Sequence, residues 1–309
     1  MKIHHINLES KLNEKLFHLA IGNFDGIHLG HKTIISKLVL DAKKNHMPSA
    51  VLSFNPHPRQ YFSKHSDKYK IISEKKKQKI LENLGVDHYF SLIFNKSIAN
   101  LSPSEFIEKI IIKQLKINKL VVGHDFRFGK NRAGDTFLLK DYATIHGFIL
   151  EVIEPVKNIS EEIFSSTAIR SAIRSGDIEK ANSMLGYNWV MEGEIIEGDK
   201  RGREINFPTA NMIPHELVYP SKGVYAIQAL IDDKIYKGIA NFGERPTVDG
   251  SKLLLETHIF NFDEEIYGKH LTVEFLTFIR SEKKFDSFSL LVEQINIDVE
   301  IVKNYHQKK

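Results

Sequence analysis

The stretch Leu19-Ala20-Ile21-Gly22-Asn23-Phe24-Asp25-Gly26-Ile27-His28-Leu29-Gly30-His31 decides the fold of the first half of this chain. Its apolar beginning is typical of a buried strand, and glycines and two histidines follow directly. Beyond it, apolar residues recur with helical spacing at Ile34, Ile35, Leu38, Val39 and Ala42. A strand, a glycine-containing loop and a helix in this order predict a nucleotide phosphate site.

The residue types in this loop are suited to binding phosphate groups. Gly26 and Gly30 allow the backbone to approach a ligand closely, and the helix beginning near Gly30 points unpaired N–H groups at an anion. His28 and His31 add imidazole donors, which would stabilise the charge on departing pyrophosphate without a covalent enzyme intermediate. The loop therefore predicts adenylyl transfer. The alternative is a surface turn that carries two ordinary histidines.

Composition limits the classes of protein that need to be considered. The chain has 309 residues, 42% of them hydrophobic, which is enough for two domains that each bury a core. It has no cysteine, so disulfides, thiolate zinc sites, iron–sulfur clusters and cysteine nucleophiles are excluded. Neither a signal peptide nor a membrane-spanning stretch is evident, so we expect a cytoplasmic protein without a membrane partner.

The charge balance gives little support for a nucleic-acid partner. The 43 basic residues face 39 acidic ones, and we expect no nucleic acid to bind. The run Lys75-Lys76-Lys77-Gln78-Lys79 is interpreted as the solvated face of a helix capped by Ser73, with Ile80, Leu81 and Leu84 turned inward. A polyanion-binding patch is the alternative.

Strand-like and helical runs alternate up to about residue 155. This pattern predicts a parallel sheet with helices on both faces and ligands at the carboxyl ends of the strands. Ser102-Pro103-Ser104-Glu105 is a capping box that opens one of the helices. The loop 123–129 would lie at the same edge of the sheet as the predicted phosphate loop, residues 22–31. The hydroxyl groups and the arginine of 165–170 are suited to binding a triphosphate. The expected strands are 16–22, 50–54, 89–94, 120–123 and 148–153.

The pattern changes beyond residue 185. Strands are expected at 190–196, 224–231, 234–241, 253–260 and 271–278, and short turns such as Asp232-Asp233 predict antiparallel pairing in a small barrel. An amphipathic helix over 287–305 would pack across it. The sequence thus predicts a Rossmann-like α/β domain over 1–185 and an antiparallel β-barrel domain with a C-terminal helix over 186–309.

The barrel region carries a second candidate site. Segment 198–211 combines glycines and basic residues with a Pro208-Thr209-Ala210-Asn211 turn, in which Thr209 and Asn211 offer oxygen ligands to Mg²⁺. Glu256 lies in the middle of an apolar strand, which is costly for a carboxylate unless it reacts or is paired, and it is the candidate general base. Alternatively, Glu256 faces solvent. His258 shares its face and can equally be structural.

Together these motifs resemble the family of bifunctional bacterial riboflavin kinases and FMN adenylyltransferases, also called FAD synthetases. The resemblance covers nearly the whole chain, and it rests on several independent motifs in one order. In the front half these are 22–31, 54–58, 123–129 and 165–170, and in the rear half they are 207–211, 223–225, 238–241, 245–247, Glu256 and 284–287.

The resemblance implies two reactions. The rear domain would transfer the γ-phosphoryl group of ATP to riboflavin, with Glu256 accepting the hydroxyl proton and with Thr209 and Asn211 holding Mg²⁺. The front domain would join AMP to FMN, giving FAD and pyrophosphate, with His28 and His31 serving this step. ATP, riboflavin and FMN would be the small-molecule partners.

The resemblance also implies the residues that bind ATP and flavin. For the front site they are Gly22, Phe24, Asp25, Gly26, Pro56, His57, Pro58, Gly123, Asp125, Phe128, Ser165, Ser166, Thr167 and Arg170. For the rear site they are Gly198, Lys200, Gly202, Arg203, Phe207, Pro208, Tyr225, Asn241, Arg245 and Arg280.

Two residues depart from the family pattern. Asn206 and Glu244 stand where glycine and threonine are common, and we expect them to weaken ATP binding at the kinase site. Three rival functions stay open: a nucleotidyltransferase for pantetheine, nicotinate or glycerol phosphates, a tRNA-binding protein related to aminoacyl-tRNA synthetases, and a non-enzymatic flavin carrier.

Overall fold

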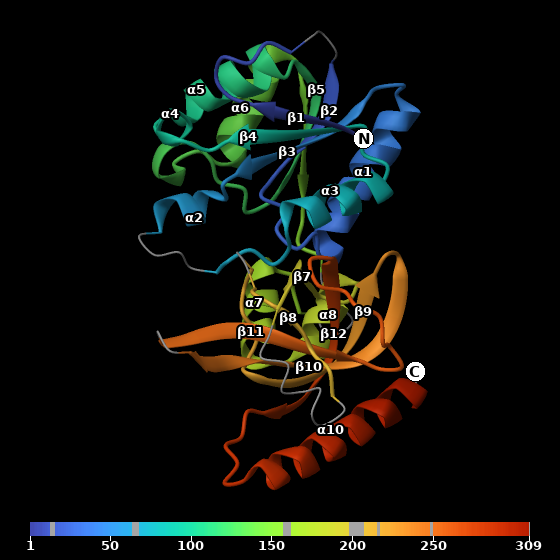
Figure 1. The fold of residues 1–309 in the computed structure, drawn as a ribbon. Coiled ribbons are helices and arrows are strands. Elements are labelled where there is room, and N and C mark those ends of the chain that lie inside the picture. The colour runs from blue at the N-terminus through green and yellow to red at the C-terminus, as the bar shows by residue number, and fades with distance from the viewer. Residues whose placement is uncertain are drawn as a thin grey trace. The chain divides into compact units, whose positions relative to one another are not determined.

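The structure, a computed structural model, describes residues 1–12, 16–63, 68–156, 162–197, 207–214, 217–247 and 250–308 (Figure 1). The chain divides into two compact units. The sheet unit comprises Met1–Asp67 and Ser73–Ser165, and the barrel unit comprises Lys68–Ile72 and Ser166–Lys309. The helices α7 (Ser166–Ser175) and α8 (Ile178–Leu185) fall in the barrel unit, and the domain boundary near residue 185 stays a prediction. Among the described residues, no helix is long and apolar enough to cross a membrane.

The sheet unit contains the parallel sheet that the alternating pattern predicts. Six strands lie in the order β1-β4-β3-β2-β5-β6, and every neighbouring pair is parallel. The edge strand β1 is not expected from the sequence, because only Ile6 in it is buried and its pairing with β4 is a long-range contact. The strands are β1 (Lys2–Ile6), β2 (Phe17–Ile21), β3 (Ser49–Asn55), β4 (His88–Ile93), β5 (Ile117–Gly123) and β6 (Ile149–Ile153).

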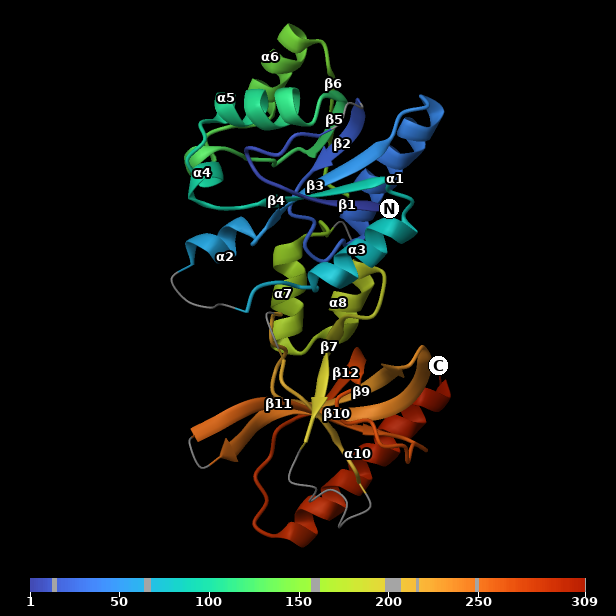
Figure 2. The same ribbon diagram turned by 45° about the horizontal axis from the view of Figure 1, so that its top comes forward.

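Helices cover both faces of this sheet, as Figure 2 shows. On one face lie α1 (Leu29–Lys44) and α3 (Glu74–Asn83). On the other lie α5 (Pro103–Phe106), the π-helix η1 (Ile107–Gln114) and α6 (Thr136–His146). The predicted capping box is confirmed, since Ser102 and Glu105 bond each other's backbone N–H groups. The remaining short elements are α2 (Pro58–Phe62), α4 (Lys96–Ala99) and the 3-10 turn η2 (Lys130–Arg132).

The lysine run departs from its expected role at one position. The hydroxyl of Ser73 accepts from the backbone N–H of Lys76 at 3.0 Å, so the predicted cap of α3 is confirmed. Lys75 and Lys79 are exposed. Lys77 is only 7% exposed, because it lies one helical turn before the buried Leu81 and on the same face. The solvated-face interpretation is therefore wrong for Lys77.

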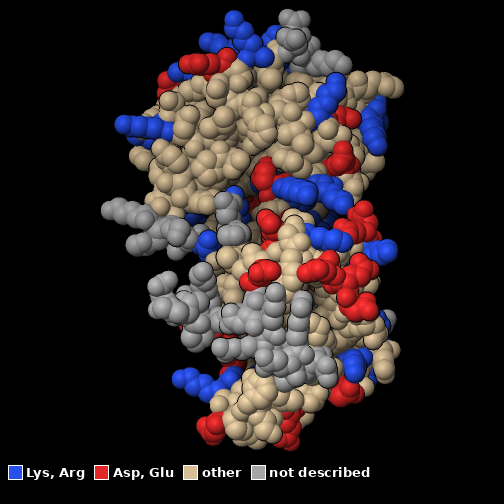
Figure 3. All heavy atoms as spheres, in the orientation of Figure 1, with Lys and Arg blue, Asp and Glu red and all other residues tan. Residues whose placement is uncertain are grey.

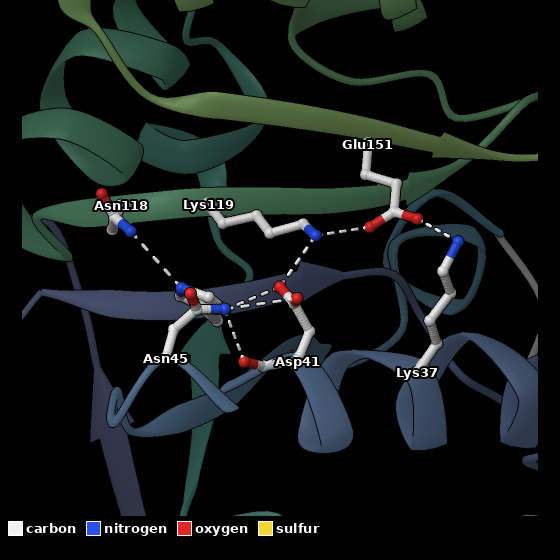
Figure 4. Close-up of polar contacts among 7 residues, drawn as sticks. Lys37, Asp41, Asn45, Asn118, Lys119 and Glu151 are labelled. Carbon is white, nitrogen blue, oxygen red and sulfur yellow. Dashed lines mark hydrogen bonds and ion pairs between the residues drawn. The ribbon is translucent and has the colours of Figure 1, made fainter. Parts of the chain in front are cut away.

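A network of charged side chains ties the second half of α1 to the sheet (Figure 4). The ammonium of Lys119 on β5 lies 2.8 Å from Asp41 on α1 and 2.7 Å from Glu151 on β6, and Lys37 pairs with Glu151 as well. The hydrogen bond from Lys119 holds the pKa of Asp41 below its usual value. Because α1 begins at the end of the loop 22–28, this network fixes the helix whose first turn belongs to the predicted phosphate site.

The barrel unit is a closed antiparallel barrel, as predicted. Its strands lie in the order β10-β11-β8-β7-β12-β9. The expected hairpin turn is confirmed, since Asp232 and Asp233 both have positive φ, as a type I′ turn requires. The strands are β7 (Val190–Ile196), β8 (Ala210–Met212), β9 (Gly223–Ile231), β10 (Lys234–Thr247), β11 (Gly250–Ile259) and β12 (His270–Ser281). The segment expected as a turn at 208–211 thus enters a short strand.

The C-terminal helix α10 (Phe288–Lys308) packs on the outer face of the barrel. Its Val299 and Val302 form a buried cluster with Val224 of β9 and Ile239 of β10. A buried ion pair adds to this contact, because Arg280 of β12 donates to Asp298 of α10 at 2.7 Å. The helix therefore covers the face of β9 and β10 that does not line the barrel interior.

Candidate active sites

Three loops of the sheet unit meet at one edge of the sheet. Strand β2 lies between β3 and β5, and all three run in the same direction. The loops that follow them therefore leave from neighbouring carboxyl ends. This arrangement brings together the sequence-predicted segments 22–28, 56–58 and 123–129.

His28 and His31 form a stacked pair at the start of α1. His28 caps the helix, because its Nδ1 accepts a hydrogen bond from the backbone N–H of His31 at 3.3 Å. The two rings stack with centroids 3.7 Å apart. An accepting Nδ1 leaves Nε2 as the nitrogen that carries hydrogen in neutral His28. The first turn of α1 thus combines backbone N–H groups with an imidazole N–H donor.

Two glycines of this loop meet different needs. Gly26 adopts φ +84°, a conformation that glycine permits and other residues rarely adopt. A Cβ atom at Gly30 would lie 3.2 Å from ring atoms of His28, so a glycine there leaves room for the imidazole. The structure thus adds a second reason for Gly30 beside the close approach of a ligand.

The other predicted residues of this loop pack around it. The ring of Phe24 lies over Gly22, with its Cζ atom 3.1 Å from where a Cβ of Gly22 would be. Asp25 is buried, at 4% exposure. The ring of Phe24 also meets His31 edge-on, with centroids 5.2 Å apart. These contacts fix the loop against the histidine pair.

The loops after β3 and β5 supply the remaining predicted residues of the sheet unit. His57, between Pro56 and Pro58, caps α2 by accepting from the N–H of Arg59 at 3.1 Å. Asp125 is exposed, and its Oδ1 lies 3.3 Å from where a Cβ of Gly123 would be. Phe128 belongs instead to the hydrophobic core, where its ring contacts Phe106 and Phe126.

The predicted segment 165–170 is divided between the two units. Ser165 follows Phe164, whose Cβ lies 3.5 Å from a Cβ position built at Gly30, and it therefore belongs near the start of α1. Ser166, Thr167 and Arg170 lie in α7 of the barrel unit. There Arg170 is buried and donates to the carbonyl of Tyr69 at 2.8 Å. A role for these three residues in phosphate binding stays a prediction.

Three polar residues form a row across neighbouring strands of the barrel. Glu256 of β11 pairs with Asn211 of β8 on one side and with Asn241 of β10 on the other. Directly opposed residues of antiparallel strands project from the same face of a sheet. Leu255 and Thr257 are fully buried, whereas Glu256 is half-buried on the opposite face. A carboxylate and two amides thus share one face of the barrel.

Asn211 has an unusual environment for an amide. It is 4% exposed, and its Oδ1 has no hydrogen-bond partner among the residues that the structure describes. Its Nδ2 donates to the carbonyl of half-buried Thr209 at 3.4 Å. A buried acceptor without a partner costs about 1–3 kcal/mol, and a bound cation would satisfy it. The Oδ1 of Asn211 therefore fits a ligand of Mg²⁺, and the part of Thr209 in that site stays a prediction.

His258 holds the segment that leads to these residues. Its Nδ1–H donates to the carbonyl of Pro208 at 2.9 Å, and its ring packs 5.0 Å from that of Phe207. Burial lowers the pKa of His258, which favours the neutral ring. The sequence left its role open. Alternation along the strand predicted its face, but the bond to Pro208, 50 residues away, is a tertiary contact.

The remaining predicted residues of the barrel site have varied environments. Tyr225 is buried against Phe275 and Phe278, and burial raises the pKa of its hydroxyl. Arg280 is engaged by Asp298, and the exposed carboxylate of Glu244 pairs with Lys222 at 2.7 Å. Arg245 lies in β10 at the register position of Lys252. Gly198, Lys200, Gly202, Arg203 and the departure at Asn206 lie outside the described residues.

The fold and its two sites define a class of two-unit phosphate-transferring enzymes, with a nucleotidyltransferase-like sheet and a kinase-like barrel. Family models agree: the FAD synthetase model matches residues 10–168, and the riboflavin kinase model matches residues 185–306. The chain belongs to the family of bifunctional riboflavin kinase/FMN adenylyltransferases.

Similar proteins span nearly the whole chain. The bifunctional riboflavin kinase/FMN adenylyltransferase of Haemophilus influenzae is 40% identical and covers 93% of each chain. Its counterpart in Escherichia coli strain K12 is 36% identical over 91% of this chain and 90% of its own length. A crystal structure described as a macrolide-efflux protein from Streptococcus pneumoniae has a TM-score of 0.88 at 30% identity, and it covers 98% of this chain and 99% of its own.

Proposed function

We propose that this chain makes FAD from riboflavin in two ATP-dependent steps. The barrel unit phosphorylates riboflavin to FMN, and the sheet unit transfers an adenylyl group from ATP to FMN with release of pyrophosphate. The observation that carries the proposal is the row of Asn241, Glu256 and Asn211 on one face of a barrel whose sequence matches the riboflavin kinase family. This match favours flavin over the substrates of the rival nucleotidyltransferases and over tRNA.

Glu256 is the general base of the phosphoryl transfer. Its carboxylate accepts the proton of the riboflavin 5′-hydroxyl as that oxygen attacks the γ-phosphorus of ATP, and ADP leaves. The reaction involves little covalent chemistry for the protein, so its rate depends on how well the reactants are positioned. Asn241, paired with Glu256 across β10 and β11, orients the reacting groups by hydrogen bonding, and Asn211 on the other side is assigned to the metal.

Thr209 and Asn211 hold Mg²⁺ in this proposal. The support is the buried Oδ1 of Asn211, which finds no protein partner within the described ranges. When bound, the ion neutralises charge on the ATP phosphates. His258 fixes the carbonyl of Pro208 and thereby the segment that carries both ligands.

The first turn of α1 serves the adenylyl transfer. An FMN phosphate oxygen attacks the α-phosphorus of ATP, and the bond from that phosphorus to the pyrophosphate oxygen breaks. The N–H groups of this turn and the Nε2–H of His28 stabilise the charge that develops on the pyrophosphate. His31, stacked on His28, keeps the imidazole in place. Asp125 and the segment 56–58 line the same edge of the sheet.

A time course tests the proposal. The purified chain is incubated with riboflavin, ATP and Mg²⁺, and the flavins are separated by chromatography. We expect FMN to appear first and FAD to follow. FMN without FAD would contradict the assignment of the sheet unit. Unchanged riboflavin together with unchanged added FMN would contradict both assignments and favour a flavin carrier or another nucleotidyltransferase.

A further inference from the structure

Lys77 is a buried lysine of α3 that contacts the backbone of the predicted phosphate loop, residues 22–31. Its ammonium donates to the backbone carbonyl of Asn23 at 3.1 Å and to the hydroxyl oxygen of Ser53 at 3.1 Å. It also pairs with the carboxylate of Glu74 at 3.5 Å. An ammonium has three donors, and these three oxygens account for all of them. One side chain of α3 thus joins the loop after β2, the strand β3 and the start of its own helix.

The carbonyl of Asn23 lies in a part of the loop that needs support. Phe24 has φ +46° and Ile27 has φ +34°, a region that non-glycine residues adopt at a cost of about 1–3 kcal/mol each. Such conformations persist only where the surroundings fix them. The Asn23 carbonyl accepts from both Lys77 and Ser53, whose hydroxyl donates at 3.1 Å. Two donors on one carbonyl hold the backbone just before the strained residues.

The charge of Lys77 is balanced locally. Glu74 accepts a hydrogen bond from the hydroxyl of Tyr89 on β4 as well as the ion pair from Lys77. Burial and the adjacent Glu74 carboxylate raise the pKa of Tyr89, so the phenol stays protonated and donates. The ammonium is therefore a fixed part of the sheet unit, and it is not a side chain that reaches the substrate.

We propose that Lys77 is a positioning residue for adenylyl transfer. By holding the Asn23 carbonyl, it sets the path of residues 22–27 and so the placement of His28 and the first turn of α1. The inference rests on the proposed function of the sheet unit. It assigns a role to a lysine that the sequence places in a solvated charge run.

The variant Lys77→Met tests this role, because it keeps most of the stem and removes the donors. We expect kcat/KM for ATP in FAD formation from supplied FMN to fall about 10–100-fold, since small misplacements near reacting groups have effects of this size. Riboflavin phosphorylation is expected to stay unchanged, because it belongs to the other unit. Lys75→Met and Lys79→Met, in exposed positions of the same helix, are the matched controls.

A second variant separates loop positioning from simple charge balance. Lys77→Met leaves the Glu74 carboxylate without its ammonium, which destabilises the sheet unit. The double variant Glu74→Gln/Lys77→Met removes that charge too, so the thermal midpoint is expected to recover while FAD formation stays slow. Full recovery of FAD formation in the double variant would overturn the inference, as would wild-type activity of Lys77→Met.

Amide hydrogen exchange gives a readout that does not depend on catalysis. We expect faster exchange in residues 22–28 of the double variant than in the wild type, and wild-type exchange in the lysine controls. Unchanged exchange in this segment would overturn the inference. If the wild-type chain makes no FAD from FMN, the proposed function fails, and the exchange experiment still tests whether Lys77 holds the loop.

Discussion

Glu256 lies directly opposite Asn211 across the antiparallel strands β11 and β8. The pairing places a half-buried carboxylate and a buried amide on one face of the barrel, outside its apolar interior. If Glu256 is the general base and Asn211 a metal ligand, as proposed, this arrangement suits phosphoryl transfer to a hydroxyl. The relationship therefore connects the sequence-predicted base to the sequence-predicted metal ligand through strand register alone.

Replacing Glu256 by glutamine removes the base and keeps the size of the side chain. We expect FMN formation to fall about 10²–10⁴-fold, the usual contribution of a general base. FAD formation from added FMN is expected to stay at the wild-type rate, because it belongs to the sheet unit, and the thermal midpoint of the barrel unit is the control for folding. Retained riboflavin phosphorylation in this variant would show that another group accepts the proton.

Asn211→Ala removes the buried Oδ1 acceptor. We expect the Mg²⁺ concentration for half-maximal riboflavin phosphorylation to rise about 10-fold or more, since an oxygen ligand of the ion is lost. The Mg²⁺ dependence of FAD formation from FMN, measured on the same sample, is the control. An unaltered Mg²⁺ requirement of the kinase reaction would rule out Asn211 as a ligand.

His28→Asn separates the two roles of His28. Asparagine is a good N-cap, so α1 keeps its cap, whereas the imidazole donor is lost. We expect kcat for FAD formation to fall about 10²–10³-fold, as when a donor to a developing negative charge is removed. Riboflavin phosphorylation should not change. If the variant forms FAD at the normal rate, His28 acts only as a cap.

Lys119→Met tests the network that anchors α1. The substitution leaves Asp41 and Glu151, both partly buried, without their shared ammonium. We expect the free energy of unfolding of the sheet unit to fall by about 2–4 kcal/mol in urea denaturation. Lys113→Met, at an exposed position, is the matched control and is expected to change stability by less than about 0.5 kcal/mol. Equal stability of both variants would contradict the anchoring role.

The stability of the sheet unit should depend on pH through His18. Burial lowers the pKa of His18 from 6.5, although the Asp41 carboxylate 3.2 Å away opposes this effect. At acidic pH, His18 therefore binds a proton more readily in the unfolded chain than in the folded one. Its contribution to stability is complete above pH 6.5 and is lost as the pH falls through the pKa of the folded state. We expect the unfolding free energy to fall from about pH 7 to about pH 5, with a shallower slope in His18→Gln. Equal slopes in the two proteins would refute this assignment.

The sequence predicted those parts of the fold that depend on local patterns. Five strands of the sheet and the hairpin at Asp232-Asp233 were found because apolar runs and turn residues mark them. Strand β1 was missed because its Lys2-Ile3-His4-His5-Ile6 sequence buries one residue and its place depends on β4. The short strand β8 was interpreted as a turn, since Pro208 precedes it and its pairing partners are distant in sequence.

For the candidate sites too, the sequence predicted what local patterns mark and missed what depends on tertiary contacts. Motifs identified His28, His31, Glu256 and Asn211, because their residue types are unusual at those positions. Alternation along β11 left open whether Glu256 faces solvent or a site, and only the register with β8 and β10 shows which residues flank it. The burial of Lys77 was not predicted, because it stands in a run of lysines that share its residue type.

The even charge balance of the sequence is also visible on the surface. On the face drawn in Figure 3, basic and acidic side chains of the described residues are interspersed.

The most direct test of the two-site account is a mixing experiment with the variants Glu256→Gln and His28→Asn. With riboflavin, ATP and Mg²⁺, Glu256→Gln alone should leave riboflavin unchanged, and His28→Asn alone should stop at FMN. A mixture of the two should make FAD, because FMN from one chain is the substrate of the other. Failure of the mixture to make FAD, with both variants folded, would contradict two separate sites on this chain.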